Sequence, residues 1–494
     1  MYEERIRNAD LRNRVISPEE AAAKIRSHMV LGFSGFTSAG YPKAIPQAIA
    51  SRGEAQDLTV FTGASTGPEL DGVLTKAGLM SRRSPFQSNV DSRKAINEGT
   101  VEFFDQHLGL MPRFIRDSRH HHLDYAIIEC CLVTEDGGVV PTLCGGSTQA
   151  MLEQADHVLL ELNLAHSAKV YGIHDNYREP GIGCRRGIPI YEVTDRIGTP
   201  AIPCDIEKIK GIVITDDFGA TPKFTPVDEV STAIAGHLID FLKSEIAAGA
   251  LPEYLYPLQS GVGSVANAVL AGLMDSGFRD LTMYTEVVQD SALELLIAGR
   301  MRAASATSLS LSRAGLDRFY SHLDQLKGKI VLRPQDISNH PEIIRRLGVI
   351  TMNTAIEADI YGNINSTNIM GSRMMNGIGG SGDFARNAQL SIFMTPSTAK
   401  GGVISSIVPM VTHVDNISQD VHVLVTEYGA ADLRGKSPKE RAEIIIETCC
   451  HPDFREPLWA YYKRALAESH ALHNPVCLTE AFRWHERYLK KGAM

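Results

Sequence analysis

The sequence predicts an α/β protein with two similar domains. Short apolar runs alternate with helical segments along most of the 494 residues, a pattern typical of parallel sheets with helical connections. Residues 280–287 (DLTMYTEV) repeat residues 57–64 (DLTVFTGA). Five such landmarks recur in the same order at an offset of roughly 210 to 235 residues, which indicates a duplicated domain rather than a solenoid of short repeats.

Length and composition limit the function classes. A chain of 494 residues is too long for one hydrophobic core, and 44% hydrophobic with 22% charged residues is a globular composition. A net charge of −9 argues against a diffuse nucleic-acid-binding surface. The charged amino terminus predicts no signal peptide, and the lack of a long apolar run predicts no membrane span. Eight cysteines without paired CxxC motifs favour a reducing cytoplasm and no metal site.

The first domain is predicted over residues 1–220. Ser17, Pro18 and Glu20 form a capping box that begins a helix reaching about residue 27. An apolar strand at 29–33 then runs through a loop of small residues, 34–40, into a helix that begins near Pro42. Further strands are expected at 58–62, 124–130, 158–162 and 210–215.

The second domain is predicted over residues 221–494. Residues 216–226 (DDFGATPKFTP) are polar and aperiodic, which marks the boundary. An amphipathic helix over about 227–247 follows, and then a loop and helix at 260–273 that echo those at 34–50. A strand is expected at 281–285, and Ser437 with Glu440 forms a second capping box near the carboxyl end.

Glu286 is the first candidate for chemistry. It lies where the strand at 281–285 ends, and functional groups in open α/β folds collect past the carboxyl ends of strands. In the first copy of the repeat, Gly63 occupies the equivalent position. An acid in only one copy of a duplicated scaffold predicts that the acid has a function.

Two glycine-rich loops predict backbone N–H groups that converge on an anion or an oxyanion. One is 376–384 (NGIGGSGDF) and the other is 261–266 (GVGSVA). The second loop begins a helix, and Glu286 lies 20 residues beyond Ala266, which approaches a dinucleotide-binding fingerprint. An NAD-dependent oxidoreductase with Glu286 as a ribose ligand is therefore an alternative. Asn339, just before a helix, is either a turn residue or an amide that holds a carboxylate.

Six stretches carry a resemblance to a known family: SGFTSAGYPK (34–43), TGASTGPELDG (62–72), QSGVGSVANAV (259–269), YTEVVQD (284–290), NGIGGSGDFARN (376–387) and TEYGAADLRG (426–435). Together they resemble the acetyl-CoA hydrolase/transferase family of class I CoA-transferases. The resemblance covers essentially the whole chain. It implies two similar open α/β CoA-transferase domains with the active site between them, usually in homodimers.

The resemblance also implies roles for particular residues. Glu286 matches the nucleophile that becomes a glutamyl-CoA thioester, Asn339 matches the residue that holds the carboxylate substrate, and Gly380 matches an oxyanion donor. The positions that match CoA contacts are Gly261, Val262, Gly263, Ser264, Val265, Ile356, Asn376, Gly380 and Lys400.

The implied activity moves CoA between a short acyl-CoA, of the succinyl-CoA or acetyl-CoA type, and a carboxylate such as acetate. The implied mechanism is ping-pong and needs no permanently bound cofactor, because CoA is a substrate. A propionyl- or butyryl-CoA transferase and an acetyl-CoA hydrolase of the same family stay open as alternatives. The absence of arginine from residues 216–225, where some relatives carry basic residues, leaves the preferred carboxylate open.

Overall fold

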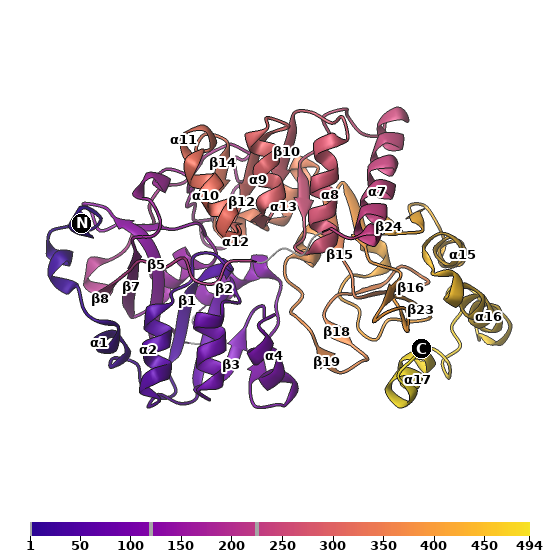
Figure 1. Cartoon of the computed structure of the whole chain (residues 1–494), viewed down its shortest axis with the longest axis horizontal. Helices are drawn as coiled ribbons and strands as arrows, with labels where there is room; N and C mark the ends of the chain where they lie inside the picture. The colour runs from indigo at the N-terminus through magenta and orange to yellow at the C-terminus, as the bar shows by residue number, and fades with distance from the viewer. Residues whose placement is uncertain (1, 118–121, 223–226) are drawn as a thin grey trace. The chain divides into compact units, whose positions relative to one another are not determined.

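The structure is a computed structural model that describes residues 2–117, 122–222 and 227–494. The chain divides into two compact units (Figure 1). Unit 1 comprises Met1–Lys223 and Thr282–Leu347, and unit 2 comprises Phe224–Leu281 and Gly348–Met494. The predicted boundary near residue 220 concerns the duplicated domains and stays a prediction; residues 223–226 of that segment lie outside the described residues.

The amino-terminal part of unit 1 is a sheet in the order β4-β3-β2-β1-β5-β7-β8, in which every neighbouring pair is parallel. Strand β6 is antiparallel to β5. The elements are α1 (Pro18–Ala22), β1 (Val30–Thr37), α2 (Ala44–Arg52), β2 (Leu58–Ser65), α3 (Val73–Lys76), β3 (Met80–Ser84), α4 (Val90–Asn97), β4 (Glu102–Phe103), α5 (Met111–Arg116), β5 (Tyr125–Val133), β6 (Val139–Pro141), α6 (Thr148–Gln154), β7 (His157–Asn163) and β8 (Ile209–Thr215).

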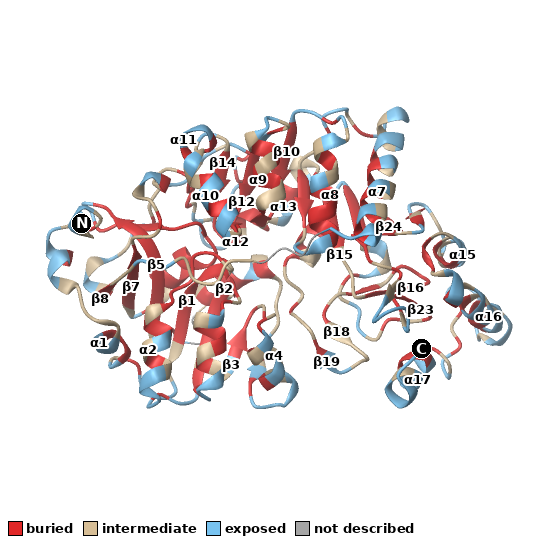
Figure 2. Cartoon of the chain, viewed as in Figure 1, coloured by how far each residue is buried: buried red, intermediate tan, exposed pale blue. Residues whose placement is uncertain are grey.

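Both faces of this sheet are buried, as expected for parallel strands. Ile127 packs with Ile45 and Ile49 of α2 in one apolar cluster. Its neighbour Ile128 packs with Met151 of α6 in a second cluster on the opposite face. The alternation of side chains along β5 therefore supplies two cores. The central strands β1, β2, β5 and β7 are buried along most of their length, while the helices expose their outer sides (Figure 2).

The rest of unit 1 contains strands β14, β12 and β10, in that spatial order. The pair β11 and β13 and helices α9 to α11 lie between these strands in sequence, and helices α12 and α13 follow β14. The elements are β10 (Leu281–Tyr284), β11 (Val287–Val288), α9 (Asp290–Ile297), β12 (Met301–Ala306), β13 (Ser308–Leu309), α10 (Arg313–Ser321), α11 (Leu323–Leu326), β14 (Ile330–Leu332), α12 (Gln335–Ser338) and α13 (Pro341–Leu347).

Unit 2 has strands in the order β9-β15-β20-β24-β25, of which only β25 is antiparallel to its neighbour. A helical region packs against β24 and β25 around a core that includes Ile445, Leu458 and Tyr461. The main elements are α7 (Glu229–Ala247), β9 (Leu258–Ser260), α8 (Ser264–Asp275), β15 (Ile350–Thr354), β20 (Leu390–Met394), β24 (Val423–Thr426), β25 (Gly429–Asp432), α15 (Pro438–Cys449), α16 (Pro452–Glu468) and α17 (Arg483–Lys491).

Short strand pairs and one short helix complete unit 2. A small sheet has the order β17-β16-β23, and β18–β19 and β21–β22 are antiparallel hairpins. Their bounds are β16 (Glu357–Asp359), β17 (Ile364–Asn365), β18 (Asn368–Ile369), β19 (Arg373–Met374), α14 (Ser381–Ala385), β21 (Thr398–Ala399), β22 (Ile404–Ser405) and β23 (Ile407–Val408).

The duplicated α/β architecture is confirmed by the strand orders. The run β14-β12-β10 repeats the order β4-β3-β2, and the run β9-β15-β20-β24 repeats β1-β5-β7-β8. Asp57 and Asp280, which open the repeated DLT stretches, both have left-handed backbones, with φ of 55° and 56°. One of the five landmarks, residues 355–363 as the repeat of residues 126–138, is displaced: β15 ends at Thr354, so this run follows the strand equivalent to β5 instead of forming it.

Both predicted capping boxes are present, at Ser17 with Glu20 and at Ser437 with Glu440. Helix α1 nevertheless ends at Ala22, five residues before the predicted end. The first backbone N–H groups of helix α2 are capped by a residue distant in sequence: Glu161, near the end of β7, accepts the N–H of Lys43 and of Ile45. Burial raises the pKa of this Glu161 carboxyl.

Candidate active site

Strand β10 and the β12–β13 connection fix the backbone of Glu286. Its carbonyl oxygen accepts N–H bonds from Thr307 at 2.9 Å and from Ser308 at 3.0 Å, and the Thr285 N–H donates to Ser305 at 2.9 Å. Glu286 therefore sits just past the carboxyl end of β10, as the sequence predicts, with its side chain half-buried. These backbone hydrogen bonds hold Glu286 in place independently of its side chain.

The side chain of Glu286 contacts the predicted site residue Asn339. Asn339 Nδ2 donates to Glu286 Oε1 at 2.7 Å, and Ser338 Oγ donates to Asn339 Oδ1 at 2.8 Å. Because Oδ1 accepts the hydroxyl bond, the amide presents its N–H to the carboxylate. Asn339 is fully buried and is the C-cap of α12.

A tyrosine supports this pair. Tyr284, two residues before Glu286, donates its hydroxyl to the carbonyl of Ile337, two residues before Asn339, at 2.6 Å. Tyr284 is fully buried, and burial raises the pKa of its phenol, so it stays a neutral donor at neutral pH. The strand that carries the acid and the helix that carries the amide are thus joined directly.

Glycines surround this region within unit 1. A Cβ at residue 63 would lie 2.5 Å from the Gly35 carbonyl oxygen and 2.9 Å from Gln335 Oε1. The Gly146 N–H donates to Thr307 Oγ1 at 3.0 Å, and the Gln335 N–H donates to the Gly146 carbonyl at 3.0 Å. The first copy of the repeat therefore has no space for an acid where the second copy carries Glu286.

The predicted loop of Gly261, Val262, Gly263, Ser264 and Val265 lies in unit 2, between β9 and the 12-residue helix α8. Gly263 has a φ of 127°, which requires glycine, and no side chain caps the helix. Val262 is 49% exposed, whereas Val265 packs into the core. The first turn of α8 thus presents backbone N–H groups at the positive end of a helix, an arrangement that suits a phosphate.

The second glycine loop, with Asn376 and Gly380, also lies in unit 2. Asn376 Nδ2 donates to the carbonyl of Ser366 at 2.8 Å, so this amide ties the loop to the segment between β17 and β18. Gly380 is buried and precedes α14 with a φ of −97°, a backbone that any residue can adopt. Its neighbour Gly379 has a φ of 65° and is the position that favours glycine.

Ile356 and Lys400 line one cavity of about 280 Å³ in unit 2. Apolar side chains form most of its wall, and Lys400 and Arg373 contribute two cations. Ile356 is half-buried, and its N–H donates to Asn365 at 2.9 Å. An apolar cavity with cations suits a ligand that combines an apolar part with phosphates. The cavity is lined by Ile356, Glu357, Ile369, Met370, Arg373, Met375, Ala399, Lys400, Ile404 and Ser405.

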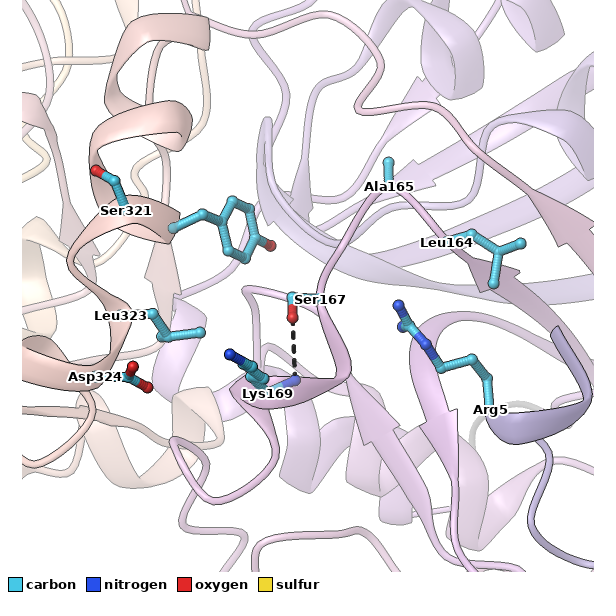
Figure 3. A pocket seen from close by; sticks show the side chains of 9 residues that line it. Arg5, Leu164, Ala165, Ser167, Lys169, Ser321, Leu323 and Asp324 are labelled. Carbon is cyan, nitrogen blue, oxygen red and sulfur yellow. Dashed lines mark hydrogen bonds between the residues drawn. The ribbon is translucent and has the colours of Figure 1, made fainter. Parts of the chain in front are cut away.

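Another pocket, of about 380 Å³, lies in unit 1 and contains none of the predicted site residues. Figure 3 shows Arg5, Lys169 and Asp324 among the side chains that line it. Tyr320 in its wall bonds to His166 Nδ1 at 2.7 Å, which ties the pocket to a buried polar network. Neither Glu286 nor Asn339 lines this pocket.

Among residues 2–117, 122–222 and 227–494, no group of three or more His, Cys, Asp and Glu side chains is placed to hold a metal ion. Within the same residues, no helix has both the length and the apolar character needed to cross a membrane.

The structure thus brings together Glu286 and Asn339 in unit 1, and Ile356 and Lys400 in unit 2. Sequence reasoning missed the residues that support them, Tyr284 and Ser338. The tyrosine lies inside the YTEVVQD stretch that signalled Glu286, so its spacing from the acid was visible. Nothing local in the sequence marks Ser338 as the residue that orients the amide.

Comparisons with known proteins agree with the earlier resemblance. The acetyl-CoA hydrolase/transferase N-terminal domain matches residues 1–186, and the C-terminal domain of the same family matches residues 315–462. The chain is 48% identical to a succinyl-CoA:acetate CoA-transferase of Clostridium kluyveri, over 100% of this chain and 92% of that protein. It is 44% identical to an acetyl-CoA hydrolase of Schizosaccharomyces pombe, over 99% of this chain and 98% of that protein.

Solved structures share the fold. RipA from Yersinia pestis superposes with a TM-score of 0.72 at 24% identity, over 92% of this chain and 98% of that chain. A 4-hydroxybutyrate CoA-transferase from Porphyromonas gingivalis gives a TM-score of 0.64 at 22% identity with the same coverage. The two curated relatives are a CoA-transferase and a hydrolase, so they lend no support to the NAD-dependent alternative. The chain belongs to the acetyl-CoA hydrolase/transferase family and is an enzyme of that family.

Proposed function

We propose that the protein is a CoA-transferase that moves CoA between a short acyl-CoA, of the succinyl-CoA or acetyl-CoA type, and a carboxylate such as acetate. The observation that carries the proposal is the hydrogen bond of 2.7 Å from Asn339 to a half-buried Glu286 carboxylate. The name of the Clostridium kluyveri relative supports the succinyl-CoA and acetate pair.

The proposed reaction is nucleophilic catalysis by a carboxylate. Glu286 attacks the acyl carbonyl carbon of the thioester, and CoA leaves as a thiolate, which gives an acyl-glutamyl anhydride. The thiolate then attacks the glutamyl carbonyl of the anhydride and releases the free carboxylate, which leaves CoA bound to Glu286 as a thioester. A second carboxylate reverses the two steps and regenerates Glu286.

In this proposal, the Glu286 backbone bonds and the Asn339 amide fix the orientation of the attacking carboxylate, which lowers the entropy cost of reaching the carbonyl. Asn339 also holds the carboxylate substrate. The Gly380 N–H is assigned to the oxyanion of each tetrahedral step, and a donor of this kind contributes about 3–4 kcal/mol. CoA binding is assigned to the loop Gly261–Val265, Ile356, Asn376 and Lys400. A homodimer and a cytoplasmic location stay predictions.

Acetyl-CoA hydrolase activity is the second candidate, because the Schizosaccharomyces pombe relative carries that name at 44% identity. The two reactions differ in whether water or a carboxylate resolves the covalent intermediate. A transferase must therefore exclude water from the anhydride and the thioester.

Initial-rate kinetics with a panel of acceptors test the proposal. Acetyl-CoA and succinyl-CoA would each be assayed with acetate, succinate, propionate, butyrate and no acceptor. A transferase gives parallel double-reciprocal lines and slow thiol release without an acceptor. Fast thiol release that no carboxylate accelerates would establish the hydrolase instead, and dependence on NAD would refute both.

A further inference from the structure

The tip of the β21–β22 hairpin carries Lys400. Lys400 has a left-handed backbone, with a φ of 50°, and the next two residues, Gly401 and Gly402, also have positive φ. These residues and Val403 are exposed. The hairpin has only two residues in each strand, so it is expected to need support from its surroundings.

The carboxyl-terminal residues supply that support. Lys400 Nζ donates to the Tyr488 hydroxyl at 2.8 Å and lies 5.4 Å from the centre of the Tyr488 ring, and the Met494 N–H donates to the Val403 carbonyl at 3.0 Å. Within the described chain, these are the hydrogen bonds that connect residues 400–403 to groups outside the hairpin. Tyr488 belongs to helix α17.

A buried hydrogen bond attaches α17 to another wall of the same cavity. His485 Nε2 bonds to Glu357 Oε2 at 2.7 Å, and both side chains are buried. Glu357 Oε1 also accepts the Thr412 N–H at 3.0 Å. Burial alone would raise the pKa of Glu357, but the bond from His485 and the other donors hold it below its usual range, so the carboxylate is charged at neutral pH. Glu357 directly follows Ile356 in the cavity wall.

We propose that helix α17 sets the position of Lys400 for a phosphate of the CoA substrate, with Tyr488 as a positioning residue and His485 as the attachment of the helix. The proposal rests on the proposed function. An ammonium has three N–H donors. The Tyr488 hydroxyl oxygen accepts one of these hydrogen bonds, so the ammonium has donors left for a phosphate oxygen. The ring beside Nζ restricts the long side chain, which lowers the entropy lost on binding.

The test compares Tyr488→Ala, Tyr488→Phe, Lys400→Ala and the double variant Tyr488→Ala/Lys400→Ala. Leu489→Ala is the matched control, because Leu489 lies next to Tyr488 on α17 and is 67% exposed. The measurements are KM and kcat with acetyl-CoA, the Kd of free CoA by calorimetry, and the melting temperature. Tyr488→Phe keeps the ring and is used if Tyr488→Ala does not fold.

Tyr488→Ala is expected to raise both KM for acetyl-CoA and Kd for CoA about five- to tenfold, because one hydrogen bond and one cation–π contact are lost. The value of kcat is expected to stay within about twofold of the wild type. Tyr488→Phe is expected to fall between the wild type and Tyr488→Ala. In the Lys400→Ala background, Tyr488→Ala should add nothing further, because the tyrosine acts through the lysine.

Effects that multiply in the double variant, or an unchanged Kd in Tyr488→Ala and Tyr488→Phe, would overturn the proposal. If kcat and the melting temperature of Tyr488→Ala both fall, the role of Tyr488 is purely structural, and this result would overturn the proposal as well. A wild-type protein that binds CoA with the expected variant pattern, but does not turn over acyl-CoA, would contradict the proposed function and leave this inference standing.

Discussion

At the scale of single residues, the proposed chemistry depends on a pair that lies 53 positions apart in sequence, Glu286 and Asn339. A hydrogen bond to a charged group contributes about 1.5–3 kcal/mol, so Asn339→Ala should lower kcat/KM by about 10- to 100-fold. Asn339→Asp should cost more, because it places a second carboxylate against the first. Steady-state kinetics with acetyl-CoA and a carboxylate acceptor check both variants.

Ser338→Ala is the matched control for this prediction. It removes the 2.8 Å bond that orients the Asn339 amide but leaves the amide itself in place. Its loss of kcat/KM should therefore be smaller than that of Asn339→Ala. Equal activity of Asn339→Ala and the wild type would show that the contact with Glu286 plays no part in the reaction.

The sequence singles out Glu286 as a candidate because its duplicate position is Gly63, and it singles out Asn339 through the family resemblance. It could not show that the two side chains touch, since that contact depends on where α12 ends and on the buried Tyr284 hydroxyl. The cap of α2 was hidden for the same reason: its acceptor, Glu161, is 118 positions from Lys43. Local patterns predict elements, whereas these contacts come from tertiary packing.

At the scale of elements, β2 and β10 are copies with different surroundings at their ends. Gly63 in β2 is closed in by the Gly35 carbonyl and Gln335, so Gly63→Ala should destabilise the protein by about 1–3 kcal/mol through overpacking. Gly236, exposed in the middle of α7 with no atom near its Cβ position, is the control. Gly236→Ala should stabilise its helix by about 0.5–1 kcal/mol.

Urea denaturation monitored by circular dichroism compares the two glycine variants. The predicted result is opposite signs for the change in the free energy of unfolding. A neutral Gly63→Ala would mean that the end of β2 has room for a side chain, and the explanation given for the missing acid in the first copy would then be wrong.

At the scale of the whole molecule, buried histidines should make stability depend on pH. Burial lowers the pKa of His166 and of His174 to about 4. Between about pH 6.5 and pH 4 the unfolded chain binds protons that these folded side chains do not. The free energy of unfolding should therefore fall as the pH drops through this range, by up to about 1.4 kcal/mol per pH unit for each histidine.

A His174 variant separates the contribution of this histidine to the pH dependence from the contributions of other titrating groups. Burial raises the pKa of Asp359 to about 6, which acts in the opposite direction over the same range. His174 Nε2 bonds to the carbonyl of Thr142 at 2.9 Å, and glutamine can donate there without titrating. His174→Gln should therefore show a shallower fall in unfolding free energy between pH 7 and pH 5. An identical slope in both proteins would contradict the assignment.

The duplicated architecture itself was predictable, because the repeat leaves landmarks in the same order and both capping boxes are local signals. The exact ends of elements were not predictable: α1 stops at Ala22 instead of about residue 27, and β1 continues to Thr37 instead of ending at residue 33. In β1, the small residues after Phe33 continue the strand because β2 pairs with Phe36 and Thr37. Pairing with a neighbour, which the sequence does not display, decides where such a strand ends.

The central claim is that Glu286 becomes covalently bound to CoA. The direct test incubates the full chain with acetyl-CoA or succinyl-CoA, quenches it, and measures intact mass and peptide masses. The prediction is a gain of one CoA minus one water on the peptide that contains Glu286, removed by acetate and absent in Glu286→Ala. Borohydride should convert the same residue to its alcohol. Turnover by the wild type with no adduct at Glu286, or an adduct that persists in Glu286→Ala, would contradict the claim.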